Sequence, residues 1–423
     1  MPHDTIALIL FVTAYGLFVA WPGRRSSVAV VTGLLLVATG TVSPHEALDG
    51  INWNVMGIFV GTLIAAEVFI ESRFPAYFAE VIVDRAPNTA WALLFICAMT
   101  GILSAFVENV ATVLIVAPIA LSLAKKIEVN PTYVMIGIAI SSNLQGTATL
   151  IGDPPSMLLG GYAKMTFLDF FVYRGRPSIF FAVELGALTS FAVLYYVFRR
   201  HHKKIDILPT ETVKSWVPTI LLVLLILMLA GSSFFDKNFC YLAGVICMVF
   251  GVAMLVWNTR GHVDSIRASL RKLDWNTTFF LMGIFVIVES LTVTGWIDRI
   301  SAALSGFTGG NTLFAYVALI VLSIIVSAFV DNVPYLAAML PVAGSMAQKL
   351  QIEPSILLFG LLIGASLGGN VTPIGASANI VATGLLRKEG YTVSFGQFAK
   401  ISVPFTLAAV IPAALFVWII WAA

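Results

Sequence analysis

Two acidic residues in apolar surroundings are the first candidates for chemistry in this chain. Glu108-Asn109 and Asp331-Asn332 each interrupt a long hydrophobic stretch. A charged side chain at the centre of a bilayer costs at least ~2.5–3.5 kcal/mol, so such a group is a functional candidate by default. When ionised, Glu108 and Asp331 could bind a coupling cation, and either could carry a proton if burial raises its pKa. The structural alternative is that Asn109 and Asn332 cap a tight turn.

Two further segments combine helix breakers with polar side chains. They are NLQGTATLIGDPPS at 143–156 and SLGGNVTPIGASAN at 366–379. Irregular backbone at membrane depth is tolerated only where it is buried in protein or lines a watery cavity, because free N–H and C=O groups find no partner in lipid. Broken helices also present carbonyl ends that coordinate cations and N–H ends that attract anions. The alternative is a simple kink between packed helices.

These segments therefore supply candidate ligands for an ion or a substrate. The candidates are Asn143, Gly146, Thr147, Thr149 and Asp153 in the first segment, and Gly369, Asn370, Thr372, Ser377 and Asn379 in the second. A set of oxygen ligands fits a hard cation such as Na+. We therefore expect a Na+ site at Glu108, Asn109, Asp331 and Asn332, and no other cofactor.

The composition indicates which elements must position these groups. Of the 423 residues 59% are hydrophobic and 11% are charged, whereas soluble proteins average about 25% charged residues. Apolar runs close to the ~20 residues that cross a bilayer recur along the whole chain. The three cysteines follow no metal-site spacing, and the five histidines fall in loops or at the terminus. The sequence predicts an integral membrane protein without a haem or zinc centre.

The apolar runs predict an all-α polytopic membrane protein with about ten full crossings. The expected crossings are 5–21, 27–42, 53–72, 133–161, 178–198, 216–233, 239–257, 276–294, 355–386 and 402–422. Two more pairs of runs have short second limbs and are predicted to form re-entrant hairpins, at 89–124 and 313–347. The crossings at 133–161 and 355–386 are too long for one straight helix, and Gly and Pro interrupt them, so each is predicted to be a broken helix.

The chain also repeats itself. SAFVENVATVLIVAP at 104–118 matches SAFVDNVPYLAAMLP at 327–341 at seven of fifteen positions, with an offset of 223, and MGIFV recurs at 56–60 and 282–286. The number of crossings between the copies places them in opposite orientations. We therefore predict two inverted-topology repeats, 1–204 and 205–423, each with one hairpin and one broken helix.

Four other acids are weaker candidates. Asp153 has no acidic counterpart, because Ala376 stands at offset 223; it could cap the second half-helix or handle a proton or substrate. Glu67 and Glu289 lie in the two MGIFV helices, and Glu184 lies a short way into its own crossing. Their roles stay open.

Basic residues near the ends of the crossings predict the orientation. Clusters at 24–25, 199–204, 260–272 and 387–388 fall on one side, which we assign to the cytoplasm, and both termini are then outside. The loop 162–177, with Lys164, Arg174 and Arg176, falls outside and disagrees with this rule.

The paired motifs resemble those of the arsenite-efflux and Na+/H+-antiporter permeases, the ArsB/NhaD group. That group includes the melanosomal P protein and plant silicon-efflux carriers, and it belongs to the ion transporter superfamily. The resemblance covers nearly the whole chain and implies a homodimer that works by an elevator motion. It places ion and substrate sites at the hairpin tips and the breaks. Ser156 stands where the group often has Asn after GDPP, so a polar contact there would differ.

From these features we expect a secondary active transporter, not an enzyme, in a bacterial inner membrane. The leading hypothesis is export of a small inorganic solute such as arsenite, antimonite or silicic acid, coupled to H+ or Na+. Acidic hairpin tips and the lack of Arg or Lys inside the crossings favour it over citrate or dicarboxylate transport. The alternative is a Na+/H+ antiporter, and inverted repeats disfavour a channel. Expected partners are the solute and membrane lipids, with no nucleic acid; any ATP dependence would need a partner ATPase.

Overall fold

The computed structural model describes residues 2–126, 129–200 and 211–422. Within these ranges the chain forms twenty α-helices and one small two-stranded sheet. The fold is that of a polytopic helical membrane protein, as predicted. Four residues of the basic cluster at 199–204, namely His201, His202, Lys203 and Lys204, lie outside the described residues.

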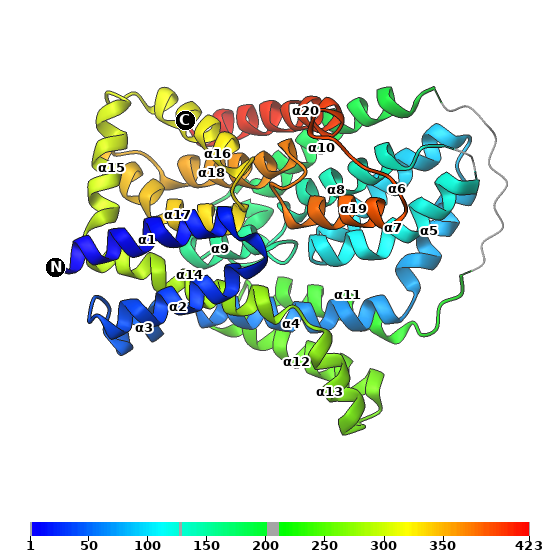
Figure 1. The fold of residues 1–423 in the computed structure, drawn as a ribbon, viewed down its shortest axis with the longest axis horizontal. Coiled ribbons are helices and arrows are strands. Elements are labelled where there is room, and N and C mark those ends of the chain that lie inside the picture. Colours follow the sequence, from blue (N-terminus) through cyan, green and yellow to red (C-terminus); the bar gives the residue numbers. More distant parts are fainter. Residues whose placement is uncertain (1, 127–128, 201–210, 423) are drawn as a thin grey trace.

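One set of helices, which we call the frame, packs along one edge of the molecule (Figure 1). The frame consists of α1 (His3–Ala20), α2 (Arg25–Ala38), α4 (Trp53–Glu71), α11 (Val217–Ser232), α12 (Leu242–Thr259) and α14 (Trp275–Val293), with the short helices η1 (Pro22–Arg24), α3 (Pro44–Gly50) and α13 (Val263–Lys272). Small residues bring its helices close together. A Cβ added at Gly251 of α12 would lie 2.6 Å from the carbonyl oxygen of Gly61 in α4, and one at Gly283 of α14 would lie 2.7 Å from the backbone of Ala29 in α2.

The second set, which we call the core bundle, contains the hairpins and the broken helices. Its first half is α6 (Thr89–Ser104), α7 (Asn109–Lys126), α8 (Thr132–Gly146), α9 (Pro154–Ala163), η2 (Leu168–Phe170), β1 (Val172–Tyr173), β2 (Arg176–Pro177) and α10 (Ile179–Phe198). Its second half is α16 (Thr312–Ser327), α17 (Asn332–Lys349), α18 (Pro354–Gly368), η3 (Gly369–Val371), α19 (Ser377–Lys388) and α20 (Phe395–Trp421). Figure 1 shows α10 and α20 along the edge opposite to α4 and α12, with α8, α17, α18 and α19 between.

Two helices that the sequence analysis did not predict connect the frame to the core bundle. They are α5 (Phe74–Asp84), between α4 and α6, and α15 (Trp296–Phe307), between α14 and α16. Each follows a residue in the left-handed conformation, Arg73 with φ 59° and Gly295 with φ 75°. The chain turns sharply again after the second connector, where α15 and α16 meet at an angle of 116°. The sequence does not indicate the connectors, because they are short and amphipathic and therefore do not resemble membrane spans.

Each hairpin tip docks into the broken helix of its own repeat through the same contacts. Thr149 donates its hydroxyl hydrogen bond to the carbonyl of Ala105, and Thr372 donates to the carbonyl of Ala328. These pairs are 223 positions apart, as are Gly152 and Gly375. A Cβ added at Gly152 would lie 2.9 Å from the Ser104 carbonyl oxygen, and one at Gly375 would lie 3.0 Å from the Ser327 oxygen. Glycine at these two positions therefore lets the hairpin backbone approach the break.

The two halves run in opposite directions, as predicted. Lys272, three residues before α14, forms an ion pair of 2.8 Å with Glu71 at the end of α4. At the other end, a Cβ added at Gly50, just before α4, would lie 2.9 Å from Glu289 near the end of α14. The two MGIFV helices are therefore antiparallel. In Figure 1 the pair α6 and α7 and the pair α16 and α17 occupy opposite halves of the long axis.

The predicted crossings correspond to helices, although a test of length and hydropathy counts them differently. Among the described residues, eight helices are long and apolar enough to span a membrane, or nine if the bent pair α15 and α16 is one span. The count includes α7, which is one limb of a hairpin. It omits α2 and α11, with 14 and 16 residues, and the broken pair α8 and α9.

Candidate functional site

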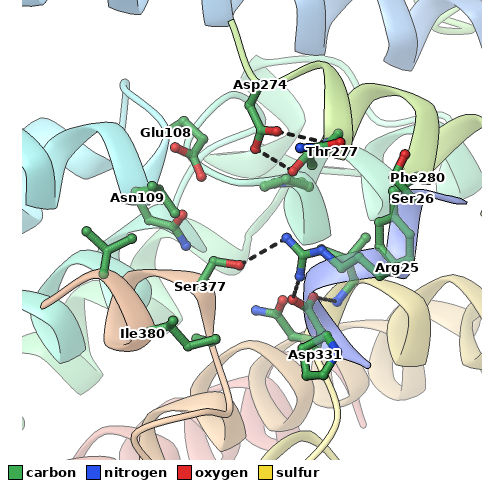
Figure 2. A pocket seen from close by; sticks show the side chains of 18 of the residues that line it. Arg25, Ser26, Glu108, Asn109, Asp274, Thr277, Phe280, Asp331, Ser377 and Ile380 are labelled. Carbon is green, nitrogen blue, oxygen red and sulfur yellow. Dashed lines mark hydrogen bonds and ion pairs between the residues drawn. The ribbon is translucent and has the colours of Figure 1, made fainter. Parts of the chain in front are cut away.

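A cavity of about 380 Å³ lies where both hairpin tips meet the frame (Figure 2). From the core bundle it is lined by the starts of α7, α9, α17 and α19, and from the frame by the α1–α2 junction and the start of α14. The polar residues of its wall are Arg25, Ser26, Glu108, Asn109, Asp274, Asn276, Thr277, Asp331, Asn332 and Ser377. The four predicted tip residues and Ser377 therefore share one cavity.

Glu108 lies at the tip of the first hairpin, directly before α7. Its Oε2 accepts a hydrogen bond of 2.9 Å from the backbone N–H of Ala111, so the carboxylate caps the helix. The neighbouring Asn109 donates from Nδ2 to Oδ1 of Asn143 at 3.1 Å. The first tip therefore presents a carboxylate to the cavity and is held to the broken helix by an amide.

Asp331 occupies the equivalent place before α17, but its surroundings differ. Its Oδ1 accepts from the N–H of Val333 at 3.1 Å, while its Oδ2 is paired with the guanidinium of Arg25. The same guanidinium donates to the hydroxyl of Ser377 at 3.3 Å and lies over the ring of Phe280, 5.2 Å from its centre. Figure 2 shows Arg25 reaching both Asp331 and Ser377.

Arg25 corrects one expectation from the sequence. The sequence predicts no Arg or Lys inside the crossings, and it places Arg25 in a basic cluster that sets orientation. The α1–α2 connection is so short that α2 begins at Arg25 itself, and its side chain, which is 23% exposed, turns into the cavity. Its neighbour Arg24 is exposed and does not line the cavity.

Asp274 is a second wall residue that the sequence analysis did not single out. It precedes α14 and accepts from the N–H of Thr277 at 3.0 Å and from its hydroxyl at 2.5 Å. An acid three residues before Thr at a helix start is a recognisable capping signal. That signal, at the beginning of the second MGIFV helix, could have pointed to this position, but not to the cavity it lines.

Four buried asparagines join the two repeats, with Asn109 in the cavity wall and the other three behind it. Asn143 of α8 donates from Nδ2 to Oδ1 of Asn370 at 2.8 Å and to Oδ1 of Asn379 at 3.0 Å, and its own Oδ1 accepts from Asn109. Asn370 in turn donates to the carbonyl of Ile140 at 3.2 Å. The predicted ligands Asn143, Asn370 and Asn379 thus meet at one point. They are not among the residues that line the cavity.

The hydroxyl groups that were predicted as ligands donate hydrogen bonds to backbone carbonyls at the breaks. Thr147 donates to the carbonyl of Asn143 at 3.1 Å, and Ser156 donates to the carbonyl of Thr147 at 3.3 Å. Asn379, at offset 223 from Ser156, donates instead to the carbonyls of Gly369 and Thr372, both at 2.9 Å. These groups, with Thr149, Thr372, Gly146 and Gly369, lie in the packed protein behind the cavity wall.

Asp153 is fully buried at the start of α9. Its Oδ1 accepts from the N–H of Ser156 at 3.0 Å, which makes it the cap of the second half-helix. Its Oδ2 accepts no hydrogen bond from the described residues. The two residues that follow, Pro154 and Pro155, line the cavity, so Asp153 lies directly behind its wall.

The other acids lie away from the tips. Glu67 is 3.6 Å from Lys272 and belongs to the ion-pair group that includes Glu71. Glu184 accepts from Nε2 of Gln145 at 3.2 Å. Glu289 lines a second cavity of about 470 Å³, at the other end of α14, together with Asn52, Tyr162 and Asp298. Within the described ranges, no group of three or more His, Cys, Asp or Glu side chains could hold a metal ion together.

Comparisons with known proteins agree with a transport function. A sequence profile described as "Citrate transporter" (CitMHS) matches residues 9–264 and 242–423. An uncharacterized transporter of Mycobacterium tuberculosis is 28% identical over 427 residues, covering 98% of each chain. The P protein of Mus musculus is 26% identical over 485 residues, which cover 95% of this chain and 57% of that protein. The YdaH transporter of Alcanivorax borkumensis, described as having an unusual topology, shares the fold with a TM-score of 0.62 and 13% identity, over 99% of this chain and 98% of that one.

Proposed function

We propose a mechanism from the premise that this chain belongs to the citrate transporter family CitMHS, whose profile matches both of its halves. It is an integral membrane protein and a secondary transporter. The proposal concerns what the family does not specify: the site, the coupling ion and the solute. We assign substrate and coupling-ion binding to the cavity at the hairpin tips, with Glu108 and Asp331 as the groups that take up H+ or Na+.

The main support for this proposal is the charge of the cavity wall. Three carboxylates, Glu108, Asp274 and Asp331, face one guanidinium, so the wall has an excess of negative charge even with Arg25 present. Such a wall repels a free, multiply charged anion and admits a cation or a near-neutral solute. A volume of about 380 Å³ suits a small molecule. We therefore propose export of a small inorganic hydroxide species, such as arsenite, antimonite or silicic acid, as in the ArsB/NhaD group.

Arg25 favours a second candidate. A guanidinium beside the hydroxyl of Ser377 is the kind of group that binds a carboxylate. An organic acid of the citrate type would fit if cotransported cations offset its charge. A Na+/H+ antiporter, in which Glu108 and Asp331 are themselves the exchange site, is the third outcome to be tested.

The positions of basic side chains suggest which side the cavity faces. Arg267, Arg271 and Lys272 of α13 directly precede the end of α14 that lines it. The positive-inside rule assigns this end to the cytoplasm, and both termini to the outside. We propose that this is the inward-facing state of an elevator in which the core bundle moves against the frame, and that the protein works as a homodimer.

Flux measurements on reconstituted protein test the solute and the coupling ion together. Proteoliposomes would be given an imposed pH gradient, with and without Na+, and assayed for arsenite, silicic acid and citrate, while a dye reports proton movement. We expect movement of the inorganic solute that depends on the gradient. Na+-driven proton movement without any solute would replace this proposal with the antiporter, and citrate movement would replace it with the second candidate.

The carboxylates are tested in the same assay. Asp331→Asn and Glu108→Gln should each abolish coupled flux, because an amide neither binds Na+ strongly nor exchanges a proton. Asp84→Asn, at an exposed residue of α5 that does not line the cavity, is the matched control and should keep full flux. Unchanged coupling in Asp331→Asn would remove this residue from the coupling site.

A further inference from the structure

The ion pair of Arg25 with Asp331 joins the frame to the core bundle inside the cavity. The ion pairs of Lys272 with Glu71 in the frame and of Lys125 with Glu389 in the core bundle, by contrast, each lie within one unit. A contact between two units that move against each other cannot persist in both of their positions. The pair is therefore tied to the conformation seen here.

Arg25 is fixed to the frame at several points. It opens α2, which packs on α14 so closely that a Cβ added at Gly283 would lie 2.7 Å from the backbone of Ala29. Its guanidinium lies over the ring of Phe280, which also belongs to α14. When the core bundle moves, Arg25 cannot follow it.

The two partners of Arg25 belong to the core bundle. Asp331 caps α17 through Oδ1, which leaves Oδ2 for the guanidinium, and Ser377 begins α19. Oδ2 is also the oxygen with which Asp331 would bind a coupling cation. The remaining charged groups of the wall are Glu108 from the first hairpin tip and Asp274 from α14, both acidic, so Arg25 is the only positive charge lining this cavity in the described residues.

We propose that Arg25 is a displaceable counter-ion that couples cation binding to movement. In the empty carrier it occupies the cation position at Asp331 and holds the core bundle against the frame. When H+ or Na+ binds Asp331, the guanidinium loses its partner and the core bundle is released. The proposal rests on the proposed transport mechanism, and it adds the residue that links the bound ion to the conformation.

The competition has a thermodynamic consequence. Because Arg25 and the coupling cation exclude each other at Asp331, removing Arg25 must raise the apparent affinity for the cation. Coupling between two ligands at one protein typically amounts to about 5-fold to 150-fold in affinity. The concentration of Na+ or H+ that gives half-maximal flux should fall by a factor in this range in Arg25→Gln.

Conformation can be measured without any transported solute. Ile380 lines the cavity and is 45% exposed, so Ile380→Cys, combined with Cys240→Ser to remove the exposed native cysteine, gives a reporter of the open cavity. The rate of maleimide labelling at high pH without Na+ then reports how often the cavity is open. In Arg25→Gln the rate should fall at least about fivefold. Arg25→Lys should stay near the parent, and Arg24→Gln is the matched control.

Asp331→Asn and the double mutant show whether loss of the Arg25–Asp331 ion pair causes the change in labelling rate. Asp331→Asn should slow labelling as much as Arg25→Gln does, and the double mutant should be no slower than either one. Na+ or acid should slow labelling in the parent and have little further effect in Arg25→Gln. If Arg25→Gln does not fold, Asp331→Asn probes the same pair from the other side.

Two results would overturn the proposal: additive effects in the double mutant, or an Arg25→Gln rate equal to that of Arg24→Gln. The assay uses no solute, so a wrong solute leaves it intact. Loss of flux in Asp331→Asn together with unchanged labelling in both single variants would retain the coupling site and reject Arg25 as its counter-ion.

Discussion

At the scale of single residues, the broken helices contain a carboxylate whose bonding is incomplete. Asp153 uses Oδ1 to cap α9, whereas its buried Oδ2 accepts no hydrogen bond from the described residues. A buried acceptor without a partner is costly, so a proton or an ion that reaches it would be stabilised. The second repeat has Ala376 in its place and leaves α19 without a side-chain cap.

Two substitutions of Asp153 distinguish its role as a helix cap from a role of its negative charge. Asp153→Asn keeps an oxygen that caps the helix, so we expect a change in stability below about 1 kcal/mol. If the carboxylate handles a proton or an ion, the same variant loses coupled flux. Asp153→Ala should lose about 1 kcal/mol from the missing cap in addition. Thermal unfolding and proteoliposome flux measure the two effects; full flux in Asp153→Asn would leave capping as its role.

Sequence reasoning located the tips but not the whole cavity wall. Glu108 and Asp331 were found because a carboxylate is conspicuous in an apolar run, and the repeat paired them. The sequence does not single out Arg25, because it stands beside Arg24 between two apolar runs, as charged residues of ordinary loops do. Its contact with Asp331 spans 306 positions and depends on the helical phase of α2. Local patterns do not contain that information.

At the scale of elements, the frame depends on glycines where helices touch through their backbones. A Cβ added at Gly61 of α4 would fall well inside van der Waals contact with the backbone of Cys247 in α12. At Gly16 of α1 nothing lies within 4 Å of an added Cβ. The two positions have the same residue type in similar helices and differ only in how close the neighbour is.

Alanine substitutions at these two glycines should therefore behave differently. Gly61→Ala forces α4 and α12 apart, and overpacking of this kind costs about 1–3 kcal/mol. Gly16→Ala should be neutral or slightly stabilising, because alanine favours the helix over glycine by up to about 1 kcal/mol. Thermal unfolding in detergent compares the two. Equal melting temperatures would mean that α4 and α12 are not held in this close contact.

The predicted elements agree with the structure best where the sequence is both apolar and long. The crossings, hairpins and breaks are found at the expected places because their pattern is set by the membrane itself. The connectors α5 and α15 are set instead by corners at Arg73 and Gly295. An arginine in the left-handed conformation gives no signal in the sequence, since this conformation favours glycine and asparagine.

At the scale of the whole molecule, the frame and the core bundle also touch at the end opposite to the tip cavity. Nδ2 of Asn52, at the start of α4, donates to the carbonyl of Gly161 in α9 at 3.4 Å. A Cβ added at Gly161 would lie 3.4 Å from the Cγ of Asn52. The Cγ of Asn52 lies about where the Sγ of a cysteine at that position would be, so cysteines at these two positions are near enough for a disulfide.

That disulfide tests whether the two units move against each other. Oxidation of the Asn52→Cys and Gly161→Cys double variant should trap this conformation and abolish flux, and reduction should restore it. Gly33→Cys with Val286→Cys is the matched control, because it joins two helices of the frame. Its disulfide should leave flux intact. Full flux in the oxidised Asn52 and Gly161 pair would contradict an elevator motion.

The asparagine cluster that joins the repeats has a consequence for how the carrier senses its surroundings. Asn109, Asn143, Asn370 and Asn379 are amides, which neither gain nor lose a proton at any physiological acidity. These four side chains therefore carry no net charge and do not respond to pH, although they lie next to the ionisable groups of the cavity wall. Ionisable groups outside this cluster, such as Glu108 and Asp331, are then the ones that respond to the gradients that drive transport. The molecule can therefore respond to large swings of acidity or salt while the joint at its centre keeps the same bonds.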